Sequence, residues 1–130
     1  MIQHLPANHR VHWHCYTGTS AIAQKFVKHF PHGFIGVSPL ITRDRDNRAH
    51  QVRAVVKAVD YPKLVFETDA PYFVPQAVRD SGIHQCEDGH PALAVFVGYF
   101  VAALVQQPME AVFQAARRNT CALYSLPLPQ

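Results

Sequence analysis

Cysteine is scarce in this sequence and follows no recognisable pattern. The three cysteines, Cys15, Cys86 and Cys121, are odd in number and lie far apart. They form neither the closely spaced pairs of a structural zinc site nor the even-numbered framework of a disulfide-rich scaffold. The sequence therefore argues against a secreted, disulfide-stabilised protein, and we expect a reducing, intracellular setting, either cytoplasmic or nuclear.

A long hydrophobic run is missing as well. The most apolar segment, residues 91–105, carries no charge but is shorter than the about 20 residues that a membrane span needs. Near the start of the chain, His4, His9 and Arg10 interrupt any apolar stretch that would serve as a secretion signal. We therefore expect no membrane partner, and we interpret residues 91–105 as a buried helix.

Charge is sparse too, since charged residues make up 16% of the chain and apolar residues 48%. A chain of 130 residues with this composition can bury the core of one domain and no more. The net charge of +3 is compatible with a phosphate-bearing substrate but does not identify one. We find no internal repeat and no low-complexity tract, which favours a single globular unit.

The hydrophobic pattern predicts short strands that alternate with helices. Strands are expected at residues 11–15, 34–37 and 64–66. Helices are expected at residues 21–29, 49–59, 91–105 and 108–123, with loops at 41–48 and 75–89. This alternation predicts an α/β protein with about three parallel strands and crossover helices. Three such strands are too few for a closed barrel, and both sheet edges would need cover.

An acidic stretch, Phe66 to Tyr72, follows the last predicted strand. Alternation along an extended chain places Glu67 and Asp69 on one face, and Pro71 ends the regular structure. Buried carboxylates are costly unless they pair with Arg or Lys or bind a metal ion. The residues alone leave both interpretations open, and ion pairs are the commoner of the two.

Two histidines, His12 and His14, lie two residues apart on the first predicted strand, so their side chains point the same way. Such a pair is a frequent metal-binding arrangement, but one buried histidine and one at the rim would fit equally well. Fifty-five residues separate His14 from Asp69, which is enough for two strand–helix units. Both are therefore expected at carboxyl ends of parallel strands, where α/β proteins bind ligands.

Several motifs together resemble the TatD family of metal-dependent deoxyribonucleases. They occur in order between about residues 10 and 126, and the spelling of residues 11–15 is most similar to the larger animal members. The matching segments are HCYTG (14–18), FIG (34–36), ETDAPY (67–72) and RNT (118–120), followed by LY (123–124).

The resemblance implies a TIM (β/α)₈ barrel of the metallo-dependent hydrolase type. Such barrels typically need about 250 residues, and this chain matches only the carboxyl-terminal portion, the last three strand–helix units. We expect residues 1–126 to form this partial barrel and residues 127–130 to be a tail.

The resemblance also implies roles for residues. His14 and Asp69 would bind a divalent metal ion (Mg, Mn or Zn), and Asp69 would be catalytic by orienting or deprotonating the attacking water. Glu67 and His12 lie one strand repeat deeper and would support the ligands without binding metal themselves. The family site also uses an amino-terminal His-x-His, a mid-chain Glu and a further His, which nothing here matches.

The implied substrate is DNA, with RNA as a further candidate. Arg43, Arg45 and Arg48 fall in the predicted loop 41–48 and are candidates for phosphate contacts. Two aspartates interleave with them, so an exposed, self-compensated loop is the alternative. Tyr72 and Phe73 could stack on a base, but we expect them to be buried under the long loop.

Three interpretations of function remain open. The leading one is half of a TatD-type nuclease, the second a non-catalytic truncated relative that acts as a scaffold or partner-binding half, and the third a small-molecule metallo-hydrolase. Because only two family ligands are matched, we expect the isolated chain to be inactive and to bind metal weakly. Incompletely covered apolar surface should make it self-associate.

Overall fold

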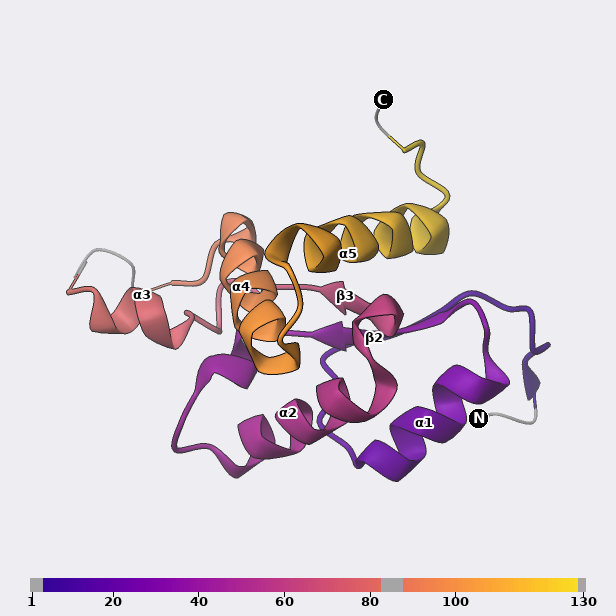
Figure 1. Cartoon of the computed structure of the whole chain (residues 1–130), viewed down its shortest axis with the longest axis horizontal. Helices are drawn as coiled ribbons and strands as arrows, with labels where there is room; N and C mark the ends of the chain where they lie inside the picture. Colours follow the sequence, from indigo (N-terminus) through magenta and orange to yellow (C-terminus); the bar gives the residue numbers. More distant parts are fainter. Residues whose placement is uncertain (1–3, 83–87, 129–130) are drawn as a thin grey trace.

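The computed structural model describes residues 4–82 and 88–128. Its centre is a three-stranded parallel sheet in the order β1-β2-β3 (Figure 1). The strands are β1 (Val11–Trp13), β2 (Gly33–Val37) and β3 (Leu64–Phe66). Two crossover helices join them, α1 (Ser20–His29) and α2 (Asn47–Val59). The predicted α/β class, with three parallel strands and crossover helices, is confirmed.

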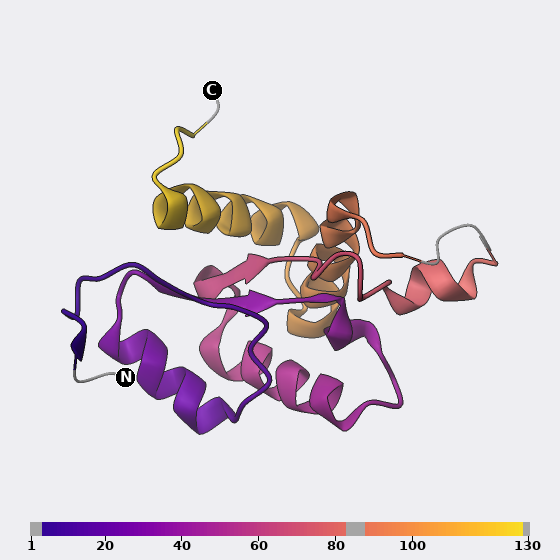
Figure 2. The ribbon, with the colours of Figure 1, turned by 180° about the vertical axis from the view of Figure 1, so that it is seen from behind.

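The segment after β3 carries three more helices, α3 (Gln76–Asp80), α4 (Ala94–Val105) and α5 (Met109–Tyr124). In both views α1 and α2 lie on one side of the sheet and α5 on the other (Figures 1 and 2). Within the described residues, no helix is both long and apolar enough to cross a bilayer.

Alternate residues of the strands enter two separate hydrophobic clusters. Ile35 and Leu64 belong to the main core, together with buried side chains of α1, α2 and α4. Phe34 and Val65 point to the opposite face, where Leu123 of α5 packs against them. The sheet is therefore covered by crossover helices on one face and partly by the end of α5 on the other.

The ends of several predicted elements differ from the observed ones. The first strand stops at Trp13 and not at residue 15, because Cys15 has a left-handed backbone with φ of 42°. The predicted loop 75–89 contains the short helix α3, and its residues 83–87 lie outside the described part. The apolar helix is buried on one side only, since Tyr99 is 47% exposed.

The predicted polar loop 41–48 was wrong over half of its length. Residues Pro39–Thr42 form a buried 3₁₀ turn, and α2 already begins at Asn47. Asp46 caps this helix, because its Oδ1 accepts a hydrogen bond from the backbone N–H of Arg48 at 2.9 Å. Arg48 therefore lies in the first turn of α2, and the loop is reduced to residues 43–46.

The contact between α4 and α5 depends on a glycine. A Cβ atom added at Gly98 would lie 2.4 Å from Cζ of Phe113 on α5. The Phe113 ring is also flanked by Phe66 and Tyr99, with centroid distances of 6.2 and 5.6 Å. The two helices can approach this closely only because residue 98 has no side chain.

We predict that Gly98→Ala destabilises the protein by about 1–2 kcal/mol. Overpacking costs roughly 1–3 kcal/mol, and the better helix propensity of alanine offsets only about 1 kcal/mol of that. Urea unfolding followed by circular dichroism measures the change. In the double variant Gly98→Ala/Phe113→Leu the losses should be less than additive, since leucine leaves room for the methyl group. An unchanged or raised stability of Gly98→Ala would contradict this packing.

We also predict a pH-dependent contribution of Asp46 to stability. Its hydrogen bonds with Arg48 lower the pKa of the Asp46 carboxyl from 3.8 to about 2. A group whose pKa is depressed by folding stabilises the folded state above its unfolded value and loses this effect as the pH falls. The difference in Tm between wild type and Asp46→Asn, which keeps a capping oxygen, should therefore shrink between about pH 4 and pH 2. Arg48→Gln should remove the larger part of this pH dependence, which the side chain causes, and keep the part that the backbone N–H of residue 48 causes. A difference between wild type and Asp46→Asn that stays constant with pH would refute the assignment.

Candidate functional site

Four side chains meet at the carboxyl edge of β1 and β3, and we call them the histidine–carboxylate cluster. They are His12, His14, Glu67 and Asp69. The His14 Nε2 atom lies 3.2 Å from Asp69 Oδ1 and 3.4 Å from Glu67 Oε2. His12 Nε2 lies 3.2 Å from the same Glu67 oxygen. Because β1 and β3 are parallel, the segments that follow them end at the same edge of the sheet.

The middle strand makes this approach across the sheet possible. A Cβ atom at Gly36 of β2 would lie 2.6 Å from His12 Nε2 and 2.7 Å from Glu67 Oε2. The other Glu67 oxygen, Oε1, accepts a hydrogen bond from the backbone N–H of Cys15 at 2.6 Å. Glu67 therefore reaches over β2 and connects the two outer strands, and any side chain at position 36 would obstruct it.

Exposure differs within the cluster. The His14 side chain is 61% exposed, whereas Asp69, His12 and Glu67 are 22%, 19% and 11% exposed. His14 is therefore the member that an incoming ligand reaches most easily, and Glu67 is the most deeply buried one.

The donor set fits part of a metal site. His12 Nε2 and Glu67 Oε2 are buried and form no well-aligned hydrogen bond although they lie 3.2 Å apart. Unsatisfied buried atoms of this kind are costly and are unusual away from functional sites. Imidazole nitrogen and carboxylate oxygen suit Zn, Mn and, for the oxygens, Mg. Among the residues that the structure describes, however, no group of three or more such side chains is arranged to hold an ion. The unsatisfied atoms belong to His12 and Glu67, so metal binding by His14 and Asp69 stays a prediction from the sequence.

One contact of the cluster was missed from the sequence. The Tyr124 hydroxyl at the end of α5 lies 2.7 Å from His12 Nδ1, so His12 is held from both sides. Arg10 bonds to the Ala122 carbonyl at 3.1 Å and to the Ser125 hydroxyl, which ties the same helix end to the segment before β1. The LY motif at 123–124 includes this tyrosine, but no local pattern indicates that residue 124 contacts residue 12.

The thiol next to the cluster is not a reactive group. Burial raises the pKa of the Cys15 thiol to about 11, and the neighbouring Asp69 and Glu67 carboxylates add to the shift. Its Sγ lies 3.4 Å from the Ser38 hydroxyl oxygen. The thiol is therefore protonated at neutral pH and does not serve as a nucleophile.

The three candidate arginines separate into two groups. Arg48 is paired with Asp46, with Nη2 2.8 Å from Oδ2. Asp44 is paired with Arg53 of α2, whose Nη2 lies 3.1 Å from Oδ1. The two aspartates that alternate with the loop arginines therefore pair with cations of α2. The self-compensation predicted for residues 41–48 is therefore confirmed in part, through the pair of Asp46 with Arg48, whereas Asp44 pairs with a cation outside this range.

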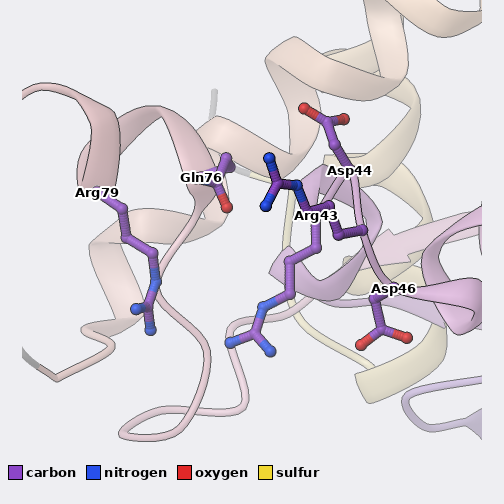
Figure 3. Close-up of a pocket in the computed structure, with 6 residues that line it drawn as sticks. Arg43, Asp44, Asp46, Gln76 and Arg79 are labelled. Atoms are coloured by element: carbon purple, nitrogen blue, oxygen red, sulfur yellow. The ribbon is translucent and has the colours of Figure 1, made fainter.

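Arg43 and Arg45 line a surface hollow of about 630 Å³, which we call the arginine hollow (Figure 3). Its lining consists of Arg43, Asp44, Arg45, Asp46, Gln76 and Arg79. Arg79 and Gln76 approach from α3 on one side, opposite the loop residues (Figure 3). Sequence reasoning missed Arg79 because residues 75–89 were expected to be a loop, although the spacing of 76 and 79 suits one helical turn.

The aromatic pair after the acidic motif behaves differently from expectation. Tyr72 is 78% exposed, so its predicted burial under the long loop is wrong. Phe73 packs partly buried against the main core, and the guanidinium of Arg43 lies 5.1 Å from its ring centroid. The ring thereby fixes one of the arginines of the hollow by a cation–π contact.

Comparison with known proteins supports the resemblance drawn from the motifs. Residues 1–125 match the profile described as "TatD related DNase". A human protein named 3'-5' RNA nuclease TATDN2 is 32% identical over 126 residues, which are 97% of this chain and 16% of that protein. The crystal structure of YJJV, a TatD homologue of Escherichia coli, superposes with a TM-score of 0.72 at 28% identity, over 90% of this chain and 41% of that one.

Two more distant structures show the same fold. An uncharacterised amidohydrolase of Saccharomyces cerevisiae has a TM-score of 0.67 at 20% identity, over 90% of this chain and 40% of that one. A TatD family hydrolase of Entamoeba histolytica has a TM-score of 0.65 at 14% identity, over 89% and 42%. The chain thus spans less than half the length of each of these relatives. Since the family profile covers nearly all of it, the chain belongs to the TatD related DNase family.

Proposed function

We propose that this chain is the part of a TatD-type nuclease that supplies two metal ligands, His14 and Asp69, for phosphodiester hydrolysis of nucleic acid. The observation that carries the proposal is their convergence, with Nε2 and Oδ1 3.2 Å apart beyond parallel strands. Family membership supports it, because the matched profile is that of DNase-related proteins. DNA is the proposed substrate, and RNA is a further one because the human relative is named an RNA nuclease.

The chain's own residues would have distinct tasks in this reaction. A bound divalent cation supplies Lewis acidity and lowers the pKa of bound water, and Mg, Mn or Zn would each serve. Asp69 orients the attacking water and accepts its proton on a carboxylate oxygen. Glu67 contacts both histidines and the Cys15 N–H, so it keeps the His14 ring turned toward Asp69.

The proposal treats residues 1–126 as part of a larger barrel and residues 127–130 as a tail. Two ligands hold a divalent ion weakly, and a reluctantly dehydrating ion such as Mg²⁺ least of all. The other donors and the strands that would flank β1 and β3 must then come from outside these residues. An intracellular setting is part of the proposal, and it is supported by the free thiols of Cys15 and Cys121.

Mutation of the two ligands tests the proposal in a complete barrel, made by joining this chain to the amino-terminal half of a family member. His14→Ala and Asp69→Asn should each lower nuclease turnover at least about 100-fold, since outer residues of metal sites already cost 10–100-fold. Circular dichroism should show an unchanged fold, because neither residue is buried in the core. The control His32→Ala removes an exposed histidine just before β2, at the other end of the sheet, and should leave turnover unchanged. Full activity of Asp69→Asn with metal present would exclude the role given to this residue.

The isolated chain should be inactive and self-associated. The chain offers only two of the metal ligands, so it should show no nuclease activity. Sedimentation should reveal oligomers, because self-association buries exposed apolar side chains such as Tyr99 and Leu126. A nuclease assay with Mg²⁺ or Mn²⁺, run beside the His14→Ala variant, measures the activity. Robust cleavage that disappears in this variant would show that these residues suffice, and the partial-site proposal would be wrong.

A further inference from the structure

The lining of the arginine hollow has three guanidinium groups and two carboxylates, and one of the three, Arg43, interacts electrostatically with Asp46. Asp44 and Asp46 line it, but they form ion pairs with Arg53 and Arg48, which do not. Among the described residues, none of the three lining arginines, Arg43, Arg45 and Arg79, has a carboxylate oxygen within ion-pair distance. The hollow therefore presents guanidinium groups that are available to an anion.

The arginines come from two different segments and are partly fixed in place. Arg43 is held against the Phe73 ring, and its backbone carbonyl accepts a hydrogen bond from Arg53 at 3.1 Å. Arg79 projects from α3, and its Nε lies 3.4 Å from the Val74 carbonyl. Guanidinium groups that approach from two sides suit a phosphate, which they can bind through paired N–H donors.

A second hollow adjoins the first and supplies aromatic surface. It has a volume of about 380 Å³ and shares Asp44 and Gln76 with the arginine hollow. Phe96, Tyr99 and Phe100 line it together with the Asp80 carboxylate, and the Arg53 guanidinium lies 4.9 Å from the Phe100 ring centroid. Basic groups next to aromatic rings are what proteins use to bind the backbone and bases of single strands. The neighbourhood thus favours a nucleic-acid strand over a free anion.

We propose that the arginine hollow binds a backbone phosphate of single-stranded nucleic acid, at a subsite separate from the metal ligands. Nucleic acid as the source of the phosphate rests on the proposed function, whereas affinity for phosphate rests on the hollow itself. Arg45 and Arg79 are the determining residues, because both are exposed and neither stabilises the core. Arg48, a candidate from the sequence, contributes indirectly, because its ion pair with Asp46 engages a carboxylate that lines the hollow.

Fluorescence anisotropy with a labelled single strand of about 12 nucleotides tests this inference on the whole chain. The assay contains a chelator, so that neither metal binding nor hydrolysis contributes. At about 50 mM salt, Arg45→Ala and Arg79→Ala should each weaken binding on the order of fivefold, and each should reduce the salt slope by about 0.7. The matched control Arg118→Ala removes an exposed arginine on α5 and should change affinity less than about twofold.

The outcomes separate this inference from the proposed function. No binding by the wild type, or equal losses in Arg118→Ala and the hollow variants, would overturn the subsite. If hydrolysis by the complete barrel depends on His14 but the affinity for the labelled strand is unchanged in Arg45→Ala and Arg79→Ala, the subsite is refuted and the nuclease proposal stands. If binding depends on these arginines but no metal restores hydrolysis in the complete barrel, the subsite holds and the nuclease proposal fails. Melting temperatures equal to that of wild type ensure that the variants are folded.

Discussion

The histidine–carboxylate cluster at the carboxyl edge of the sheet depends on one contact. In this contact the Glu67 side chain crosses Gly36 of β2 and reaches β1 and the residues that follow it. One carboxylate accepts the Cys15 N–H with one oxygen and meets both His12 and His14 with the other. β1 and β3 have no direct hydrogen bonds with each other, because β2 lies between them. Pairing of each outer strand with β2 sets their spacing, and the Glu67 side chain adds a direct link between them across Gly36.

This arrangement explains why such short strands are sufficient. β1 and β3 have three residues each, so backbone pairing alone would fix their ends poorly. Side chains beyond the strands supply the missing restraint. Asn119 of α5 adds to it at the opposite end, where its Nδ2 donates to the carbonyls of Pro62 and Leu64 at 3.0 and 2.7 Å. The third strand is thus held at both ends by side chains from outside the sheet.

Periodicity and turn signals predicted the fold well, because the alternating strands and helices each carry a local pattern. The alternating order of strands and helices also predicted that His14 and Asp69 lie at one edge of the sheet, because the carboxyl ends of parallel strands lie at the same edge. What the sequence could not give were contacts between distant segments, such as Tyr124 with His12. Arg79 was missed for a related reason, as a helix of five residues has too little periodicity to stand out in a long polar stretch. The pairing of Arg48 with Asp46 shows the same limit, because the sequence does not indicate which neighbouring charges form the helix cap, and a phosphate contact of Arg48 stays a prediction.

The hydrogen bond between Tyr124 and His12 joins residues 112 positions apart, whereas the bond of Glu67 to Cys15 spans 52. Contacts between distant residues form late, since the chain entropy lost in closing a long loop must be overcome first. During synthesis the sheet can form once Glu67 has emerged, but His12 acquires its second partner only when the last helix is complete. The orientation of this imidazole is therefore completed late in folding, and a chain that lacks α5 would hold His12 through Glu67 alone.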